Sequence, residues 1–343
     1  WVRKSFCPRQ TTRQMLRCGI IGYGKMGKTR ARVVHASGRA AVAAVYDAHP
    51  LDPVPEFPVV ADEAAILDDP SIDAVFVCTP NYRIEPLVKA ALQRGKHVFA
   101  EKPPAFNAAG VRAVREVEAA ATGCKLMYGF NHRHHLSIER MKAMIDGGDL
   151  GRVLWMRGRY GKEVDASFFE GWRAKPDLAG GGIMLDQGIH MLDLFIYLAG
   201  QFDDVHALVS NLFWKIEGLE DNVFAILRNR SNGVCASLHS TMTQWRYLFS
   251  LEVFLEGGAL ILNGLKTSSG AYGDEDLCVK RNAASSSGAY HAEEHIIYKT
   301  DTSWASEVEH FFDAIEQDRP VATGNSSDAL AVMEIMDRIY ACA

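Results

Sequence analysis

The sequence feature that most constrains the fold is a glycine-rich turn near the start of the chain. An apolar run over residues 16–22 ends in Gly22-Tyr23-Gly24-Lys25-Met26-Gly27, and helix-forming residues continue to Ala36. At this spacing the first glycine permits a tight turn, the second lets the backbone approach a diphosphate, and the third lets helix pack on strand. The helix N-terminus then offers free N–H groups to an anion. The pattern predicts a dinucleotide site at Gly22, Gly24, Lys25, Met26 and Gly27.

An acidic residue closes the next predicted strand. Apolar residues 41–46 are followed by Asp47, whose carboxylate can accept hydrogen bonds from an adenosine ribose and would repel a 2′-phosphate. Ala48 and His49 supply no lysine or arginine for such a phosphate. The sequence therefore predicts NAD, with NADP still possible because a distant basic residue could reach the site. The alternative is a simple glycine turn with an incidental aspartate.

Strands and helices alternate through the first half of the chain. Further strands are predicted over residues 74–78 and 98–100, with helices over 61–67 and 85–94. Strands about 25 residues apart, joined by helices, indicate right-handed crossovers and a parallel sheet. The uninterrupted apolar run at 74–77 is typical of a sheet covered on both faces.

A lysine follows the strand at 98–100. Glu101-Lys102-Pro103-Pro104 comes where open α/β sheets place their ligands, at the carboxyl ends of the strands. Proline cannot donate to a sheet ladder, so the two prolines end the strand and keep Lys102 at the rim of the sheet. A functional lysine is the interpretation we adopt, and an ordinary surface lysine is the alternative.

A second group of polar residues lies within a predicted helix over residues 184–198. Asp186, His190 and Asp193 are spaced so that all three can share one helical face. A neutral histidine can take the proton of a hydroxyl, and a nearby carboxylate can orient the ring. A neighbouring ammonium can stabilise negative charge on the oxygen. In the alternative, Asp186 caps the helix and His190 is a histidine of the core.

The pattern of predicted elements changes after Asn131, and strands dominate the second half. After a helix over 136–145 and a strand over 152–160, strands are predicted over 205–213, 222–228, 234–241, 249–256 and 259–265. Gly257-Gly258 indicates a hairpin, and such neighbours are normally antiparallel. Residues 267–288 are predicted as a long, mobile surface loop around a strand at 277–280. Two helices, over 303–317 and 328–342, close the chain.

These patterns predict an α/β chain of two domains. We assign residues 1–15 to a basic, disordered leader, 16–131 to a dinucleotide-binding domain with a doubly wound parallel sheet, and 132–343 to an α+β domain with an open, mostly antiparallel sheet. A length of 343 residues agrees with two domains of ordinary size.

Composition limits the partners. Thirty-seven Lys and Arg against 42 Asp and Glu give a net charge of −5, so we expect no nucleic-acid partner, and no apolar run approaches the length of a membrane span. Seven scattered cysteines without a Cys-x-x-Cys pair favour a reducing compartment, the cytoplasm, over a disulfide framework or a structural zinc site. A small molecule is the expected partner.

Several motifs together resemble a known family, the Gfo/Idh/MocA oxidoreductases, named for glucose-fructose oxidoreductase and inositol dehydrogenase. The resemblance runs from about Leu16 to the end and rests on Gly22 to Gly27, Thr79-Pro80-Asn81, Glu101-Lys102-Pro103, Gly129-Phe130-Asn131-His132-Arg133, Trp172-Arg173, Gly180-Gly181-Gly182 and Asp186 to His190. It implies an N-terminal Rossmann domain and a C-terminal domain whose open sheet commonly makes oligomer contacts. We therefore expect a homodimer or homotetramer.

The resemblance also assigns residues. It identifies Lys102, Asp186 and His190 as the catalytic set, with the histidine as acid/base. It adds cofactor contacts, namely Thr79, Pro80, Asn81, Glu101 and Lys102. Two positions depart from the family pattern, Ile84 in place of a frequent histidine and Pro104 in place of leucine, and neither removes a catalytic group.

Substrate contacts are predicted from chemistry. Polyols need many hydrogen-bonding groups and tryptophan can pack on the C–H face of a pyranose, so the candidates are Asn131, Arg133, Trp172, Arg173 and Gln187. His132, His134 and His135 either line the substrate cavity or mark a polar loop or helix start. No metal site is predicted there, and His291 and His295 are expected on a surface helix or loop.

The predicted function is NAD-dependent oxidation of a secondary hydroxyl in a sugar, a nucleotide sugar or a cyclitol. One alternative is a reductase for a non-sugar substrate, such as a dihydrodiol or a tetrapyrrole. The other is a non-catalytic dinucleotide-binding regulator on the same fold, which would have no need for Lys102, Asp186 and His190 together.

Overall fold

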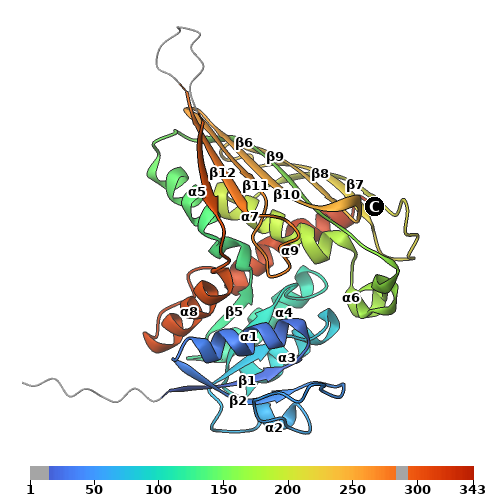
Figure 1. Ribbon diagram of the computed structural model, residues 1–343, viewed down its shortest axis with the longest axis vertical. Coiled ribbons are helices and arrows are strands. Elements are labelled where there is room, and N and C mark those ends of the chain that lie inside the picture. The colour runs from blue at the N-terminus through green and yellow to red at the C-terminus, as the bar shows by residue number, and fades with distance from the viewer. Residues whose placement is uncertain (1–14, 283–292) are drawn as a thin grey trace, which may run out of the picture.

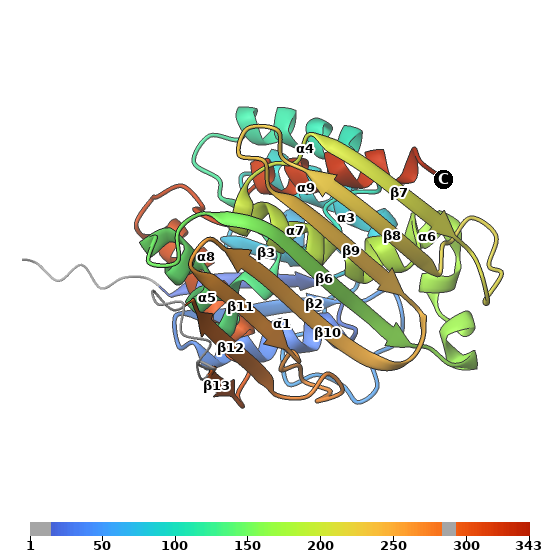
Figure 2. The same ribbon diagram turned by 90° about the horizontal axis from the view of Figure 1, so that it is seen from above.

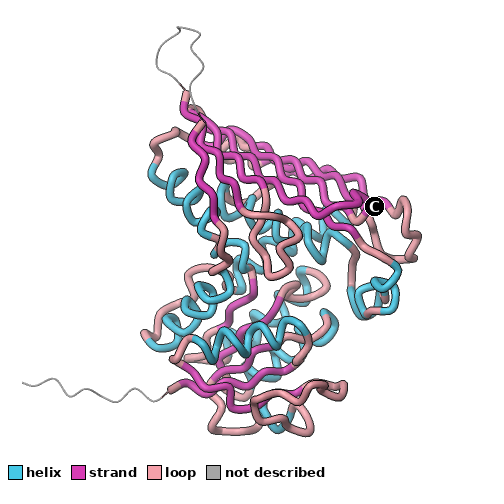
Figure 3. The backbone as a smooth tube through the Cα atoms, viewed as in Figure 1, coloured by secondary structure: helices cyan, strands magenta, loops and turns pink. Residues whose placement is uncertain are grey.

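The structure is a computed structural model that describes residues 15–282 and 293–343. The predicted basic leader therefore lies outside the described residues except for Met15, as do His291 and residues 283–288 of the predicted loop. Two sheets lie one above the other, and helices fill the space between them (Figures 1 and 3). Within the described ranges, no helix is long and apolar enough to cross a lipid bilayer.

The N-terminal sheet has five parallel strands in the order β2-β1-β3-β4-β5. Its strands are β1 (Leu16–Ile21), β2 (Ala40–Tyr46), β3 (Ala74–Val77), β4 (His97–Glu101) and β5 (Leu126–Gly129). Helices α1 (Lys25–Ala36), α2 (Ala64–Leu67), α3 (Asn81–Gln93) and α4 (Ala108–Ala120) connect them. An isolated parallel bridge from Val45 to Val59 lies where a further Rossmann strand would flank β2. The predicted parallel sheet is confirmed, although α4 and β5 were not predicted.

The strand order places three predicted motifs at one rim of this sheet. Strands β1 and β3 are neighbours, with β2 on one side and β4 on the other. From β1 the chain first adds a strand on one side of the sheet and then adds the remaining strands on the other side. Ligands bind at such a switch point, outside the carboxyl ends of the strands. Gly22 and Lys102 come directly after their strands there, and Thr79 follows its strand after one further residue.

The C-terminal sheet has eight strands in the order β13-β12-β11-β10-β6-β9-β8-β7. They are β6 (Val153–Glu163), β7 (Asp204–Ser210), β8 (Asn222–Arg228), β9 (Cys235–Thr241), β10 (Thr243–Leu255), β11 (Gly258–Asn263), β12 (Glu275–Arg281) and β13 (Glu294–Tyr298). Only β6 and β9 are parallel among the described pairs, so the predicted mostly antiparallel sheet is confirmed.

Two strands differ from the prediction. β10 begins at Thr243 instead of Phe249, because the pairing with β6 continues across a register shift. β13 was not predicted, and His295 lies on this edge strand instead of a surface helix or loop. A short strand with few core side chains carries little hydrophobic pattern, so the sequence gives it a weak signal.

Helices cover one face of the C-terminal sheet and leave the other face open (Figures 1 and 2). The covering helices are α5 (Leu136–Gly147), α7 (Ile189–Ala199) and α9 (Ser326–Tyr340). Buried apolar side chains form one cluster that runs from Val75 in β3 through Met333 in α9 to Leu251 in β10. This shared core fixes the rim of the first sheet against the second.

The last part of the chain packs back on the N-terminal sheet. Helix α8 (Ser303–Glu316) contributes Phe311, whose ring lies 5.6 Å from that of Phe99 in β4. Helix α9 packs against α4. The domain boundary after residue 131 therefore stays a prediction, since C-terminal helices contribute to the core of the N-terminal half.

Candidate active site

The glycine turn has the shape that a diphosphate requires. Gly22 has a φ of +91°, and a Cβ there would lie 2.6 Å from the Cys78 carbonyl oxygen. A Cβ at Gly27 would lie 2.0 Å from the Gly22 oxygen, whereas one at Gly24 would meet nothing within 4 Å. Helix α1 starts after Gly24 with no side-chain cap and no acidic residue in its first turn. Open space and free N–H groups therefore coincide, as anion binding needs.

Asp47 stands at the end of β2 beside a cavity. Its Oδ2 accepts a hydrogen bond from the Tyr23 backbone at 2.7 Å, and its Oδ1 accepts one from His49 at 3.0 Å. The cavity has a volume of about 380 Å³, and its walls include Leu51 and Val54. No lysine or arginine is among its described lining residues. Apolar walls around one carboxylate fit adenosine without a 2′-phosphate.

The lysine after β4 reaches the helix that follows the three glycines. Lys102 Nζ donates a short hydrogen bond to the Asp186 carbonyl oxygen, and it lies 3.5 Å from Asp186 Oδ1. Asp186 belongs to a π-helical turn, Met184–Gly188, that leads into α7; such turns are frequent at functional sites. Burial lowers the pKa of Lys102, Asp186 opposes that shift, and Arg173 and Lys162 add to it.

Three cationic side chains surround the Asp186 carboxylate. Lys162 Nζ lies 2.5 Å from Oδ2, and Arg173 Nε lies 3.4 Å from Oδ1, in addition to Lys102. Burial acts to raise the pKa of Asp186, but Lys162, Lys102 and Arg173 together hold it well below its usual value. Asp186 is therefore an anion that orients ammonium groups. Lys162, at the end of β6, was not predicted as a site residue. Its position near the end of a predicted strand was the one sequence signal for it.

His190 follows Asp186 by one turn and stacks on a second histidine. The rings of His190 and His132 lie 3.8 Å apart at 14°. Burial and the charge of Lys102 lower the pKa of His190 well below 6.5, with Asp186 opposing. Its Nδ1 is buried and has no hydrogen-bond partner among the described residues. His190 is thus a neutral imidazole with the capacity to accept a proton.

His132 belongs to a polar network beneath the site. Its Nδ1 lies 3.1 Å from Asn131 Oδ1, and its Nε2 lies 3.2 Å from the Tyr160 hydroxyl. The Tyr160 ring adjoins Tyr272, whose hydroxyl accepts a 2.6 Å hydrogen bond from Gln187. The sequence left open whether His132 lines the substrate cavity or marks a polar loop or helix start, and it did not predict this stack, which needs residues from two distant segments.

Asn131 is one of the predicted substrate contacts and is already engaged. Its Nδ2 donates to Ser303 Oγ at 3.1 Å, and its Oδ1 faces His132. Gln187, by contrast, keeps a buried Oε1 without a partner in the described part of the chain. Gln187 therefore retains capacity for a ligand, whereas Asn131 acts on His132.

Arg133 and Asp193 pair with each other instead of facing the site. Arg133 donates from Nε at 2.8 Å and from Nη2 at 2.6 Å to the buried Asp193 carboxylate, and its Nη1 reaches Asp328 at 2.9 Å. Asp193 therefore does not orient His190, as the helical spacing suggested. Arg133 is 4% exposed, and its guanidinium is engaged by two carboxylates, so its predicted contact with a substrate stays a prediction. The π-helical turn offsets Asp186 from the face that carries Asp193.

Of the predicted cofactor contacts, Glu101 and Asn81 already have partners in the protein, whereas Thr79 has none in the part of the chain that the structure describes. Glu101 accepts a 2.7 Å hydrogen bond from the buried Arg30, so its carboxylate is committed. Asn81 donates to the Ala179 carbonyl oxygen at 2.7 Å and ties α3 to the glycine loop. The Thr79 hydroxyl is buried and unpartnered among the described residues, and thus remains available to a cofactor.

A short segment covers Asp186 from the solvent side. Trp172 and Arg173 lie in a 3₁₀ turn, Trp172–Ala174, with the guanidinium carbon 4.4 Å from the indole centroid. Together with Phe168 they line a cavity of only about 10 Å³ next to Asp186. Both residues therefore lie beside Asp186, and their contact with a substrate stays a prediction.

Comparisons with known proteins identify the family of the chain. Residues 16–130 match the profile described as "Oxidoreductase family, NAD-binding Rossmann fold", and residues 138–261 match "GFO/IDH/MocA C-terminal domain". Inositol 2-dehydrogenase of Rhizobium meliloti is 27% identical over 94% of this chain and 95% of that protein.

Two further matches carry the name levoglucosan dehydrogenase, one a sequence and one a solved structure. Levoglucosan dehydrogenase of Pseudarthrobacter phenanthrenivorans is 31% identical over 57% of this chain, so the match spans about half of that protein, 54%. A levoglucosan dehydrogenase structure in complex with NADH and levoglucosan superposes with a TM-score of 0.83 at 22% identity, covering 96% of this chain and 97% of that one. The structural likeness supports the two-sheet fold.

Proposed function

Because the chain belongs to the Gfo/Idh/MocA family of NAD-binding oxidoreductases, we propose that it is a dehydrogenase that oxidises a secondary hydroxyl of a sugar, nucleotide sugar or cyclitol. The observation that carries the proposal is the contact of Lys102 with Asp186 beside the neutral His190. Relatives named for inositol, levoglucosan and glucoside oxidation support this substrate class.

The chain's own residues fit NAD. The turn from Gly22 to Gly27 would hold the diphosphate and Asp47 the adenosine ribose, with Thr79 and Pro80 at the neighbouring strand end. When bound, the nicotinamide supplies an acceptor for a hydride. We assign the remaining chemistry to side chains of the protein.

The proposed reaction removes one proton and one hydride from the substrate. His190 takes the hydroxyl proton as the O–H bond breaks, and a bound nicotinamide would accept the hydride that the carbinol carbon loses as the C=O bond forms. Lys102 stabilises the negative charge that develops on the substrate oxygen. Asp186 keeps Lys102 charged and oriented through the contacts described above.

Charge favours one kind of substrate within this class. Lys102, Lys162 and Arg173 face a single carboxylate, Asp186, so positive charge is in excess. The Arg173 guanidinium lies on Trp172, which leaves its terminal N–H groups available to a bidentate anion. We therefore favour a sugar that carries an anionic group, such as a nucleotide sugar, over a neutral cyclitol.

The test is a substrate panel on the purified full-length chain. NAD⁺ is mixed with neutral polyols, sugar acids, nucleotide sugars and a dihydrodiol, and NADH formation is followed by absorbance. Turnover with an anionic sugar supports the full proposal, and turnover with neutral polyols alone would reject the charge argument. NAD binding without turnover of any member would favour the regulator, and turnover of a dihydrodiol alone would favour the non-sugar reductase.

The proposed assembly is a homodimer or homotetramer through the open face of the C-terminal sheet. Large apolar side chains are exposed there, with Leu208 73%, Ile226 60% and Phe224 49% exposed. An apolar patch of this kind is typical of protein interfaces.

The free thiols of the six described cysteines support a reducing compartment such as the cytoplasm.

A further inference from the structure

Four polar side chains gather on the open face of the C-terminal sheet, at its β12–β13 edge. Cys278 in β12 pairs directly with His295 in β13. Side chains two residues apart lie on the same face of a strand, so Asp276 lies beside Cys278, and Glu293 beside His295. The alternate residue Leu277 points into the core. The strand register itself therefore brings the four together.

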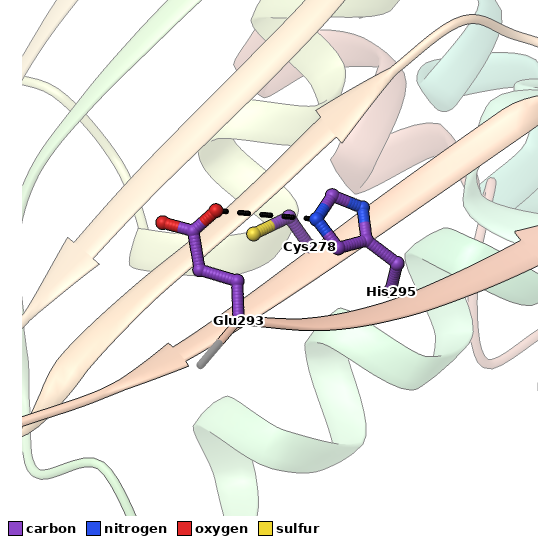
Figure 4. A group of neighbouring side chains, drawn as sticks. All are labelled: Cys278, Glu293 and His295. Carbon is purple, nitrogen blue, oxygen red and sulfur yellow. Dashed lines mark ion pairs between the residues drawn. The ribbon is translucent and has the colours of Figure 1, made fainter. Parts of the chain in front are cut away.

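The potential ligand atoms are close to one another (Figure 4). One ligand atom each of Cys278, Glu293 and His295 lies within 4.8 Å of the other two, and His295 Nε2 lies 3.9 Å from Glu293 Oε2. Tetrahedral zinc, with bonds of about 2.0–2.3 Å, holds its ligands roughly 3.3–3.8 Å apart. His295 and Glu293 are exposed, with side chains 50% and 39% accessible, so small rotations can close the difference.

The histidine is already oriented as a metal ligand. His295 Nδ1 lies 2.8 Å from Asp276 Oδ1, and a carboxylate accepts hydrogen bonds, so Nδ1 carries the proton. In the neutral ring the lone pair is then on Nε2, which faces Glu293. A carboxylate that holds the outer nitrogen of a ligating histidine is a regular companion of protein-bound zinc.

We propose that Cys278, Glu293 and His295 bind a zinc ion, with Asp276 orienting His295 and a water molecule as fourth ligand. A thiolate, an imidazole and a carboxylate form the mixed set that zinc accepts. The ion would join the edge strand β13 to β12 in addition to the hydrogen bonds between them. The site lies on the sheet face opposite α7, so it is separate from Lys102 and His190.

The Cys278 thiol carries its proton when no metal is bound. Burial and the neighbouring Glu293 raise the pKa of Cys278 to about 11, with Lys280 opposing. Zinc would displace that proton, and binding should strengthen as the pH rises. In the competing arrangement, a protonated His295 pairs with Asp276 and Glu293 beside an inert thiol.

The experiment is a cobalt titration of the metal-stripped full-length protein at neutral pH. Co²⁺ replaces zinc in such sites, and a thiolate ligand gives it an intense charge-transfer band. We expect a band that saturates at one equivalent and disappears when zinc is added. The band should be absent in Cys278→Ser and retained in Cys342→Ser, a matched control because Cys342 is an exposed thiol beyond α9.

Two surface variants keep the test valid if Cys278→Ser folds poorly. His295→Gln should lose the band, and Asp276→Asn should weaken cobalt binding by about 10–100-fold, as expected for a residue that orients a ligand. No saturable band in the unmodified protein, or a band that survives both Cys278→Ser and His295→Gln, overturns the proposal.

Discussion

Two aspartates on one helical stretch have opposite surroundings. The Asp186 side chain is 23% exposed and faces two lysines and an arginine from three different segments. Asp193 is fully buried and faces Arg133, which binds it through two nitrogens. The first environment has more positive charge than one carboxylate can neutralise, and the second pairs the charges and excludes water.

The pKa directions follow this difference. The cations around Asp186 hold its pKa well below the usual value despite its burial, whereas burial raises the pKa of Asp193 even beside Arg133. A buried ion pair with satisfied hydrogen bonds has a structural role, because removing one partner leaves an uncompensated buried charge. A partly exposed carboxylate with surplus cations has interactions to offer a ligand. Asp186 therefore belongs to the proposed chemistry and Asp193 to the scaffold.

The largest expected effect is a loss of turnover when a cation beside Asp186 is removed. Lys102→Met should lower kcat by up to about 10⁴-fold, because charge on the substrate oxygen loses its ammonium partner. The unfolding midpoint should stay close to that of the unmodified protein, and NAD affinity should fall far less than kcat, although Lys102 is also a predicted cofactor contact. Steady-state kinetics, NAD titration and thermal unfolding check the three statements. Turnover within tenfold of the unmodified rate would remove Lys102 from the catalytic set.

The Asp193 side should respond in stability. Arg133→Met leaves a buried carboxylate without its partner and should lower the free energy of unfolding by about 3–5 kcal/mol. Arg173→Met is the matched control, since the Arg173 side chain is 45% exposed and should cost little stability while impairing turnover. Urea unfolding of both variants measures the difference. Equal losses of stability would break the comparison.

A third carboxylate extends the comparison to the cofactor. Asp47→Ala should weaken NADH binding by about 10–100-fold, the cost of hydrogen bonds to a charged acceptor. The loss for NADPH should be smaller, because the repulsion of a 2′-phosphate disappears with the carboxylate. Fluorescence titration with both reduced cofactors measures the ratio. An unchanged ratio would mean that Asp47 only holds the turn through Tyr23 and His49.

The sequence predicts the parts of the site that depend on near neighbours. Gly22, Asp47 and Lys102 follow strands in an order that has few topological solutions, so their common rim was predictable. Asp186 and His190 were predictable because one helix carries both.

Contacts between distant segments gave no such signal. Lys162 reaches Asp186 from β6, and His132 stacks on His190 from the 3₁₀ turn after β5, both through the packing of the two sheets. Arg133 matched the chemistry of a substrate contact, yet its partners lie on α7 and α9. Residue type and helical spacing describe what a side chain can do, and the tertiary fold decides which partner it meets.

The smallest expected effect concerns pH and the state of His190. Its folded pKa is lowered well below 6.5, as is that of His132, so both rings remain neutral through the physiological range. The acid limb of kcat/KM should therefore lie below pH 6.5, with little change between pH 6.5 and 7.5.

Stability should follow the same proton balance. Below about pH 6.5, His132 and His190 bind protons in the unfolded chain but stay neutral in the folded protein. The free energy of unfolding should therefore fall as the pH falls. Asp186 should not add to this loss until the pH approaches the usual aspartate value near 3.9, because its carboxylate stays ionised in the fold. The contradicting result would be an acid limb of kcat/KM above pH 6.5 that is unchanged in Lys102→Met. It would mean that burial and the charge of Lys102 do not keep His190 neutral. The titrating group would then belong to a different part of the site.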